Sequence, residues 1–392
     1  MALPRVFLIF NKTDWPCFTR QDEVRAIAAV GRKRGFTVIA VNRPLCPLST
    51  AIRKRHRVSE YFRKERLEPI AENLFLASPK YWLSDVVAWR YPWITRRNVV
   101  TLRKWYDRVR TQLGLGSEPP LVWYYHPVQG YVSRLFPGAP TVYEMYDYLA
   151  DAGDNPDVVG QRLEVAQRSQ VDVLICVTPS LHQRYASFYK NAWISGNGLS
   201  QSALSRFESD GITVDPRVAA IAHPRLGYAG VISKRLDWPL LRALVERNPA
   251  WQFVFVGRQQ EDYCTRWLGS APNVHFLGEV ERDHVPEVVA GFDVGLLPYL
   301  PSEFICHSNP LKFYEAAAAG VPSVSAPNDL LASFPDELVR TVACNPEEWE
   351  AAIQAALTLR PADLRRRYAA VLGEHTWEKI AERVVDNLIA AV

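Results

Sequence analysis

Short runs of β-branched and aromatic residues recur along the C-terminal half of the chain, and glycine or proline closes each of them. Segments of helical pattern separate them, and the runs read LGYAG from Leu226, WQFVFVGR (251–258), NVHFLG (273–278) and FDVGLLPY (292–299). Such runs predict β-strands, and strands that alternate with helices predict a parallel, doubly wound sheet. Ligands of these sheets bind beyond the carboxyl ends of the strands. Polar residues that directly follow the runs are therefore the first candidates for a binding site.

The segment His307–Ala326, HSNPLKFYEAAAAGVPSVSA, predicts a helix that leads into a buried strand. Asn309 can cap this helix, Pro310 fits its first turn and Gly320 ends it. The segment therefore places the start of a helix directly beside the predicted sheet.

Lys312 and Glu315 lie three residues apart in this segment, so they share one face of the helix near its N-terminus. Free backbone N–H groups and the helix dipole stabilise anions there, and Lys312 adds a full positive charge. Glu315 is placed to accept hydrogen bonds from hydroxyl groups such as those of a ribose. The alternative is a surface helix on which the two residues form an ordinary ion pair.

A basic loop follows the run that begins at Leu226. Ser233, Lys234 and Arg235 lie in it, ahead of a helix predicted to begin near Asp237. A strand that ends in a basic loop of small residues before a helix is a phosphate-binding arrangement. The sequence thus predicts a second group of phosphate ligands in the same half of the chain.

The C-terminal half resembles the donor-binding half of GT-B glycosyltransferases of bacterial polysaccharide assembly, near the large family-4 group. The resemblance rests on the order of the segments LGYAGVISKRLDW, WQFVFVG, NVHFLGEV, FDVGLLPY and NPLKFYEAAAAGVPSVSAP. The resemblance covers residues 225–328 well and the N-terminal half more weakly. It implies two Rossmann-like α/β domains, each doubly wound, that face each other across a cleft, with a C-terminal helix that crosses back to the first domain. It also implies a nucleotide-diphosphate sugar, with UDP-sugars favoured, as the donor substrate.

The resemblance assigns roles to the candidate residues. It implies that Lys312 contacts the donor diphosphate and Glu315 the ribose, while the loops at Gly257 and Glu279 frame the base. No metal or other cofactor is expected, because side chains and a helix dipole neutralise the diphosphate in this fold. The donor-binding residues predicted in this way are Gly230, Ser233, Arg235, Gly257, Arg258, Glu279, Val280, Asn309, Leu311, Lys312 and Glu315.

One position departs from the pattern of the retaining enzymes. These usually carry a further glutamate where this chain has His307. The sequence is in this respect more similar to membrane-associated inverting glucuronosyltransferases, which use an aspartate of the N-terminal domain as a base. Asp147, in YEMYD at the end of the strand predicted at 140–148, is the candidate, and Glu144 and Asp151 are its competitors. A turn or helix-cap role for Asp147 is the alternative.

Other polar residues follow predicted strands of the N-terminal half. His126 ends the strand predicted at 121–126, and imidazole titrates near neutral pH, so it is a second catalytic candidate or a purely structural histidine. Asp14, Arg20 and Gln21 follow the strand Val6–Phe10 and are candidates for binding the acceptor. A capped helix with a solvated face is the alternative for these three.

Length and charge indicate the domains and the partners. The 392 residues fit two domains, predicted at 1–215 and 216–375, with a terminal helix at 376–392. Basic residues mixed with aromatic ones at 52–66 and 89–110 suit an anionic lipid surface, although solvated helix faces would have the same composition. The sequence shows no nucleic-acid-binding motif, so a nucleic acid is not expected as a partner.

The N-terminus and the cysteines indicate the compartment. The start of the chain lacks the pattern of a signal peptide, and no apolar stretch approaches the length of a membrane span. Six cysteines are scattered without metal-ligand spacing, which predicts reduced thiols in the cytoplasm. A protein of the cytoplasm is therefore expected, either cytosolic or peripheral on the cytoplasmic face of the inner membrane.

The sequence predicts an inverting glycosyltransferase that acts on a glycan or a polyprenyl-diphosphate-linked acceptor. A retaining enzyme and a non-catalytic sugar-nucleotide or lipid-binding protein of the same fold remain alternatives. An NAD-dependent or sugar-nucleotide-modifying enzyme is disfavoured, because NKTDWPC rather than Gly-x-Gly-x-x-Gly follows the first strand.

Overall fold

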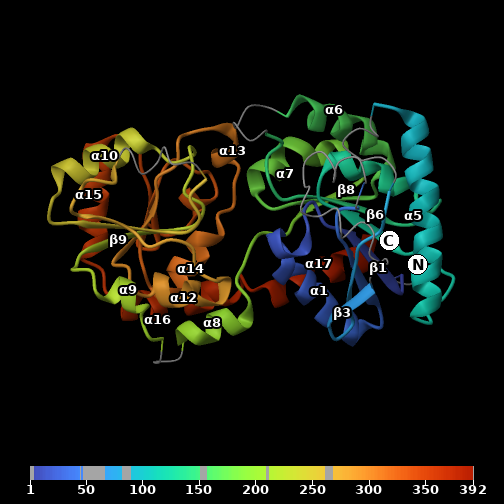
Figure 1. Ribbon diagram of the computed structural model, residues 1–392, viewed down its shortest axis with the longest axis horizontal. Coiled ribbons are helices and arrows are strands. Elements are labelled where there is room, and N and C mark those ends of the chain that lie inside the picture. The colour runs from blue at the N-terminus through green and yellow to red at the C-terminus, as the bar shows by residue number, and fades with distance from the viewer. Residues whose placement is uncertain are drawn as a thin grey trace. The chain divides into compact units, whose positions relative to one another are not determined.

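The computed structural model divides the chain into two compact units, which are described separately (Figure 1). The N-terminal unit comprises residues 1–195 and 377–392, and the C-terminal unit comprises residues 196–376. The structure describes residues 4–44, 46, 67–81, 90–150, 157–208, 212–260 and 268–391. The predicted basic segment 52–66, Trp89, Asp151 and Cys264 lie outside these residues, as do residues 209–211 near the predicted domain boundary.

The N-terminal unit contains an eight-stranded sheet in the order β3-β4-β2-β1-β5-β6-β7-β8. Neighbouring strands are parallel except for β3 and β4. The strands are β1 (Val6–Phe10), β2 (Thr37–Val41), β3 (Leu67–Ala71), β4 (Leu74–Ala77), β5 (Leu121–Tyr124), β6 (Thr141–Met145), β7 (Val173–Cys176) and β8 (Asn191–Ile194).

The central strands β1, β5, β6 and β7 are buried along their whole length, as expected of a parallel sheet that is covered on both faces. The helices of this unit, with 3-10 helices labelled η, are η1 (Trp15–Cys17), α1 (Gln21–Arg34), α5 (Pro92–Gln112), η3 (Pro127–Arg134), α6 (Val158–Gln167), η4 (Arg168–Gln170), α7 (Pro179–Tyr185), η5 (Ala186–Phe188) and α17 (Trp377–Ala391).

The terminal helix α17 packs in the N-terminal unit against α1. Its apolar face is buried through Trp377, Ile380 and Val384. At its surface, Lys33 Nζ lies 2.9 Å from Glu382 Oε1 and Arg34 Nη2 lies 2.7 Å from Asp386 Oδ1. Burial of the apolar face holds the helix in place, because exposed ion pairs contribute little.

The C-terminal unit contains a six-stranded, fully parallel sheet in the order β11-β10-β9-β12-β13-β14. Its strands are β9 (Arg225–Ala229), β10 (Gln252–Val256), β11 (Val274–Phe276), β12 (Val294–Leu297), β13 (Ser323–Ser325) and β14 (Val339–Thr341). Its helices are α8 (Gln201–Glu208), α9 (Pro216–Ala219), α10 (Trp238–Arg247), η6 (Arg282–His284), α12 (Val285–Val289), α13 (Glu303–Cys306), α14 (Leu311–Ala319), η7 (Leu331–Ser333), α15 (Pro346–Leu357) and α16 (Pro361–Gly373).

Two apolar cores lie in this unit. One is packed around α14, with Phe313 and Tyr314 at its centre, and the other around α10 and α15, with Trp238 and Trp349. The sheet is thus covered by helices on both faces, as predicted for a doubly wound domain.

The boundary between the units falls at Ser195 and Gly196, earlier than the predicted position at residue 215. Leu204 and Phe207 of α8 are buried in the core of the C-terminal unit together with Val218 of α9. The backbone of Leu199 bonds to the carbonyl of His375 at 3.0 Å. The apolar face of α8 therefore ties residues that were predicted in the N-terminal domain to the C-terminal unit.

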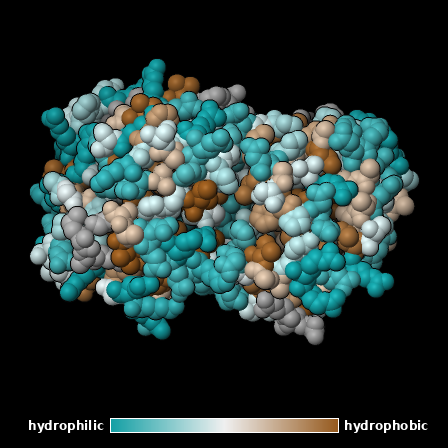
Figure 2. Space-filling view, turned by 180° about the vertical axis from the view of Figure 1, so that it is seen from behind, coloured by the Kyte–Doolittle hydropathy of each residue, from teal (hydrophilic) through white to brown (hydrophobic). Residues whose placement is uncertain are grey.

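One face of the molecule is mostly hydrophilic (Figure 2). On the face in Figure 2, hydrophobic residues form small separate spots among hydrophilic ones. Such scattered residues are ordinary on folded proteins. Among the described residues, the large aromatic side chains that are most exposed are Trp93, Phe188 and Tyr91, and two of these, Tyr91 and Trp93, lie at the start of α5.

Candidate functional site

Two glycines bring two strand ends of the C-terminal unit into contact. Gly230 follows β9 with φ +152°, and Gly257 follows β10 with φ +139°. The N–H of Gly230 donates to the carbonyl of Val256 at 2.7 Å. A Cβ on Gly257 would lie 2.1 Å from the Gly230 carbonyl oxygen. Only glycine permits this approach, so the loops after both strands share one small area at the carboxyl edge of the sheet.

Lys312 lies directly over Gly230. A Cβ on that glycine would come within 2.0 Å of the lysine Cε and 2.7 Å of its Nζ. The ammonium also lies 5.4 Å from the centre of the Tyr228 ring, within the range of a cation–π contact. The missing side chain of Gly230 therefore leaves the space in which the lysine crosses the end of the strand.

Lys312 and Glu315 line the same hollow. Its volume is about 20 Å³, and Gly227, Gly295 and Ser323 contribute to the wall. Both side chains belong to the first turns of α14, where the backbone N–H groups are not used by the helix. The site thus combines a cation, helix N–H groups and a carboxylate, which suit a phosphate joined to a group with hydroxyls.

The expected N-cap at Asn309 is wrong. Pro310 occupies that position with extended backbone, and α14 begins at Leu311 without a side-chain cap. Asn309 is buried, and its carbonyl accepts from Nδ2 of Asn197 at 2.7 Å. The helix still ends at Gly320, whose φ of +74° is left-handed, as predicted. Asn309 therefore anchors the loop that positions Lys312.

The basic loop after β9 holds the other predicted phosphate ligands. Ser233 is buried, and its Oγ accepts from the backbone N–H of Arg235 at 3.3 Å. The guanidinium carbon of Arg235 lies 4.3 Å from the centre of the Phe304 ring. Asp237 caps α10 by accepting from the N–H of Leu240 at 3.0 Å, so that helix begins where it was predicted.

The loops predicted to frame the base are neighbours. The N–H of Gly257 donates to the carbonyl of Gly278 at 2.8 Å. Arg258 and Glu279 are exposed, and Val280 is half-buried. These residues therefore follow adjacent strands at the same edge of the sheet as Gly230.

His307 lies between two carboxylates. Its Nε2 is 3.6 Å from Oε2 of Glu303 and its Nδ1 is 3.9 Å from Oδ2 of Asp329. The imidazole is 15% exposed. It thus stands, with an acidic group on either side, at the position where the retaining enzymes usually carry a glutamate.

In the N-terminal unit, Asp147 lies just beyond β6 and is half-buried. Strands β1, β5 and β6 are adjacent, so Lys12 after β1, His126 after β5 and Asp147 after β6 follow neighbouring strands at one edge. Lys12 Nζ lies 5.3 Å from the centre of the Tyr146 ring, and burial raises the pKa of that tyrosine. The predicted base is therefore at a strand end where a parallel sheet carries its ligands.

His126 has a structural partner on each ring nitrogen. Its Nδ1 accepts from the backbone N–H of Val128 at 3.2 Å, and its Nε2 lies 3.5 Å from Oδ2 of Asp157. The hydrogen bond from His126 lowers the pKa of Asp157. With Nδ1 accepting a backbone hydrogen, the proton of the neutral ring is on Nε2. His126 in this arrangement has no lone pair with which to take a proton from a substrate. Its pairing with Asp157 could not be found from the sequence.

Arg20 belongs to a buried ion cluster. Its guanidinium bonds to both carboxylate oxygens of Glu23, at 2.9 and 3.0 Å, and to Glu144. It is 2% exposed, and Glu144 is completely buried. Burial and the nearby Glu23 carboxylate raise the pKa of Glu144. Arg20 is therefore corrected from an acceptor ligand to a structural cation, and Glu144 is its partner rather than a competing base.

Gln21 and Asp14 shape the loop before α1. Nε2 of Gln21 donates to the carbonyl of Trp15 at 2.7 Å, and the carbonyl of Asp14 accepts from the N–H of Cys17 at 2.9 Å. Both side chains are half-buried. They remain accessible at the edge where Lys12 and Asp147 lie.

Sequence comparison identifies the class of the C-terminal unit. Residues 223–359 match the family described as glycosyl transferases group 1. The teichuronic acid biosynthesis glycosyltransferase TuaH of Bacillus subtilis (strain 168) is 33% identical over 101 residues. That match covers 25% of this chain and 25% of the relative, so the chain spans about a quarter of the curated relative it matches.

Structure comparison extends the likeness to both units. An Escherichia coli structure described as trehalose-6-phosphate bound with UDP-2-fluoro glucose has a TM-score of 0.67 at 12% identity and covers 98% of this chain and 99% of its own. An α,α-trehalose-phosphate synthase (UDP-forming) from Burkholderia xenovorans in complex with glucose-6-phosphate also has a TM-score of 0.67 at 12% identity, over 98% and 100%.

The chain therefore has the GT-B fold of two Rossmann-like domains, and its C-terminal unit carries a glycosyl transferases group 1 domain. Within the described ranges, no helix is both long and apolar enough for a membrane span, and no cluster of metal-ligating side chains is present.

Proposed function

We propose that this protein is an inverting glycosyltransferase that moves a sugar from a nucleotide-diphosphate sugar, UDP-linked by preference, to a glycan or a lipid-diphosphate-linked acceptor. The placement of Lys312 carries the proposal. It crosses Gly230 at the end of β9, shares a hollow with Glu315 and lies in the first turn of α14. The group 1 match over this same region supports a sugar-nucleotide ligand.

In the proposed reaction, the C-terminal unit holds the donor. Lys312, Arg235 and the N–H groups at the start of α14 neutralise the diphosphate, and Glu315 accepts from the ribose hydroxyls. Gly257, Arg258, Glu279 and Val280 border the base. The charge on the leaving diphosphate grows in the transition state, so a fixed cation there lowers the barrier.

The N-terminal unit supplies the base in this proposal. Asp147 takes the proton of the acceptor hydroxyl as its oxygen forms the bond to the anomeric carbon. The bond from that carbon to the diphosphate oxygen breaks, and the nucleoside diphosphate leaves with the electron pair. Asp14 and Gln21 are the acceptor-side residues, and neither this step nor donor binding requires a metal.

The site of the reaction in the cell is the cytoplasmic face of a membrane in this proposal. Tyr91 and Trp93 are exposed at the start of α5, where Arg96 and Arg97 are exposed as well. Rings at an interface and cations at anionic headgroups favour such a surface.

The test is thermal stability with UDP-, GDP- and dTDP-linked sugars, since a ligand of the folded state raises the melting temperature. We expect a selective shift, and Lys312→Ala should raise the Kd about 10- to 100-fold, as loss of a charged hydrogen bond costs about 1.5–3 kcal/mol. Arg242→Ala is the matched control, because Arg242 is exposed and pairs with Glu246 on α10.

A second measurement separates the enzyme from a binding protein of the same fold. Asp147→Asn should retain the donor-induced shift and lose transfer and donor hydrolysis. Absence of turnover in the unaltered protein, with donor binding intact, would favour the non-catalytic alternative. A product that keeps the donor's anomeric configuration would favour a retaining enzyme.

A further inference from the structure

A groove crosses the N-terminal unit between α5, η3 and α6. Its volume is about 610 Å³, within the roughly 300–1,000 Å³ of small-molecule sites. Pro127 and Val128 form one part of its wall, and they directly follow His126 at the carboxyl end of β5. The groove therefore adjoins the strand edge at which Asp147 lies, but Lys312 and Glu315 have no part in it.

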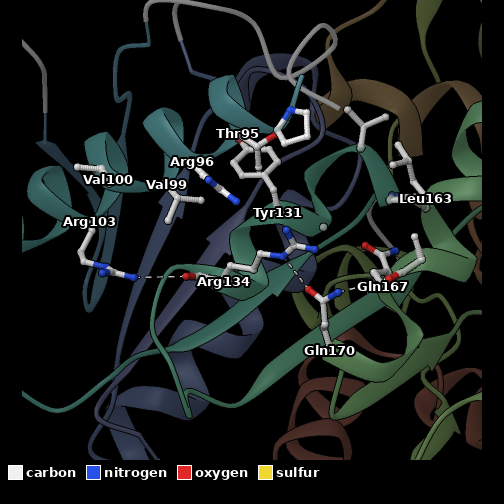
Figure 3. Close-up of a pocket in the computed structure, with 15 residues that line it drawn as sticks. Thr95, Arg96, Val99, Val100, Arg103, Tyr131, Arg134, Leu163, Gln167 and Gln170 are labelled. Carbon is white, nitrogen blue, oxygen red and sulfur yellow. Dashed lines mark hydrogen bonds between the residues drawn. The ribbon is translucent and has the colours of Figure 1, made fainter. Parts of the chain in front are cut away.

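The groove is cationic. Three arginines and no carboxylate are among its fifteen lining residues, and Figure 3 shows Arg96 from α5 and Arg134 from η3 extending into it. Nε of Arg103 donates to the carbonyl of Leu135 at 2.7 Å, and Nε of Arg134 donates to Oε1 of Gln170 at 2.9 Å. Each guanidinium has further N–H donors, so these bonds orient the groups while leaving donors for an anion.

The side-chain amide of Gln167 favours a ligand that carries hydroxyl groups. It lines the groove and is 5% exposed. Within the described part of the chain, neither its amide oxygen nor its amide nitrogen has a hydrogen-bond partner. A Cβ on Gly130 would lie 1.6 Å from this oxygen, so the glycine admits the amide to the wall. An alkyl chain would leave both atoms unpaired, whereas a hydroxyl can donate to the oxygen and accept from the nitrogen.

We infer that the groove binds the body of an acidic saccharide, a chain of sugars that carry carboxylates, as the acceptor. Arginines meet the carboxylates, Gln167 meets hydroxyls, and Val99, Val128 and Leu163 pack against the ring C–H faces. The sugar to be extended lies beyond Pro127, toward Asp147. This inference rests on the proposed transferase function and specifies its acceptor.

Titration calorimetry of the full chain with trigalacturonate tests the inference, with neutral maltotriose for comparison. We expect trigalacturonate to bind at least tenfold more tightly. Arg96→Gln should weaken its binding about tenfold, since a charge-assisted bond is lost. Arg108→Gln is the matched control, because Arg108 is an exposed arginine of α5 that does not line the groove.

Gln167→Leu provides a second variant. It removes the unpaired buried amide at similar size, so the melting temperature should stay or rise while trigalacturonate affinity falls. Unchanged affinity in both Arg96→Gln and Gln167→Leu would overturn the inference. Complete displacement by an equal concentration of inorganic phosphate would also overturn it and indicate an anion site alone. Binding to phosphatidylglycerol vesicles that depends on Arg96, without binding of trigalacturonate, would overturn it in favour of a lipid surface.

The same preparations distinguish this inference from the proposed function. A melting shift with a nucleotide sugar, without trigalacturonate binding, refutes only the acidic acceptor. Absence of a nucleotide-sugar shift and of turnover refutes the transferase itself, whatever the groove binds.

Discussion

Replacement of Arg20 by methionine should destabilise the N-terminal unit by about 3–5 kcal/mol, the typical loss when one partner of a buried ion pair is removed. The variant leaves Glu23 and Glu144, which are 1% and 0% exposed, without their cation. Tyr125 still donates a hydrogen bond to Glu23 and Trp123 one to Glu144, both at 3.1 Å. These two donors are neutral, so they do not replace the positive charge of Arg20. For a unit of this size the loss corresponds to a fall in Tm of about 6–20 °C.

Calorimetry with circular dichroism measures the effect, and Arg32→Met is the matched control. Arg32 pairs with Glu72 at the surface, where the two side chains are 63% and 73% exposed, so its loss should cost about 0–1 kcal/mol. The deficit of Arg20→Met should shrink as the pH falls below 7, because burial raises the pKa of Glu144 and protonation removes its charge. A loss below about 1 kcal/mol at pH 7 would refute the role of this cluster.

Two further predictions concern local structure. Gly257→Ala should lower the free energy of unfolding by about 1–3 kcal/mol, because the new Cβ would meet the Gly230 carbonyl and the residue has a positive φ. Thermal unfolding measures this loss. Gly373→Ala is the control and should show no such loss, because no neighbouring atom lies within 4 Å of its Cβ. Asp157→Asn should lower stability at pH 7, because pairing with His126 holds the carboxyl pKa below its ordinary value of 3.8. That contribution is full above the unfolded pKa and is lost as pH falls through the folded one, so a pH-independent difference would contradict it.

The sequence predicted the elements that have a strong local pattern. Runs such as Val6–Phe10 and Trp251–Arg258 became β1 and β10, because continuous apolar runs are the pattern of strands covered on both faces. The half-exposed β8 and the three-residue β14 have too few residues to show a period. The convergence of Lys312 and Glu315 on one hollow followed from their spacing on a helix.

Other parts of the site depend on contacts between distant segments. Arg20 and Glu144 are 124 residues apart, and the strand and helices that bury Arg20 could not be located from the pattern around it. The pairing of His126 with Asp157 and the groove beside η3 likewise arise only when the helices pack. The N-cap at Asn309 was wrong because a buried bond to Asn197 holds that residue in the preceding loop.

The packing of α17 on α1 has a consequence for the order of folding. The C-terminal unit, residues 196–376, is inserted into the chain of the N-terminal unit, whose last helix is Trp377–Ala391. During synthesis every residue of the C-terminal unit is therefore added to the chain before the helix whose Trp377 ring covers the Arg20 guanidinium at 4.8 Å in the N-terminal unit. The unit synthesised first is thus completed last.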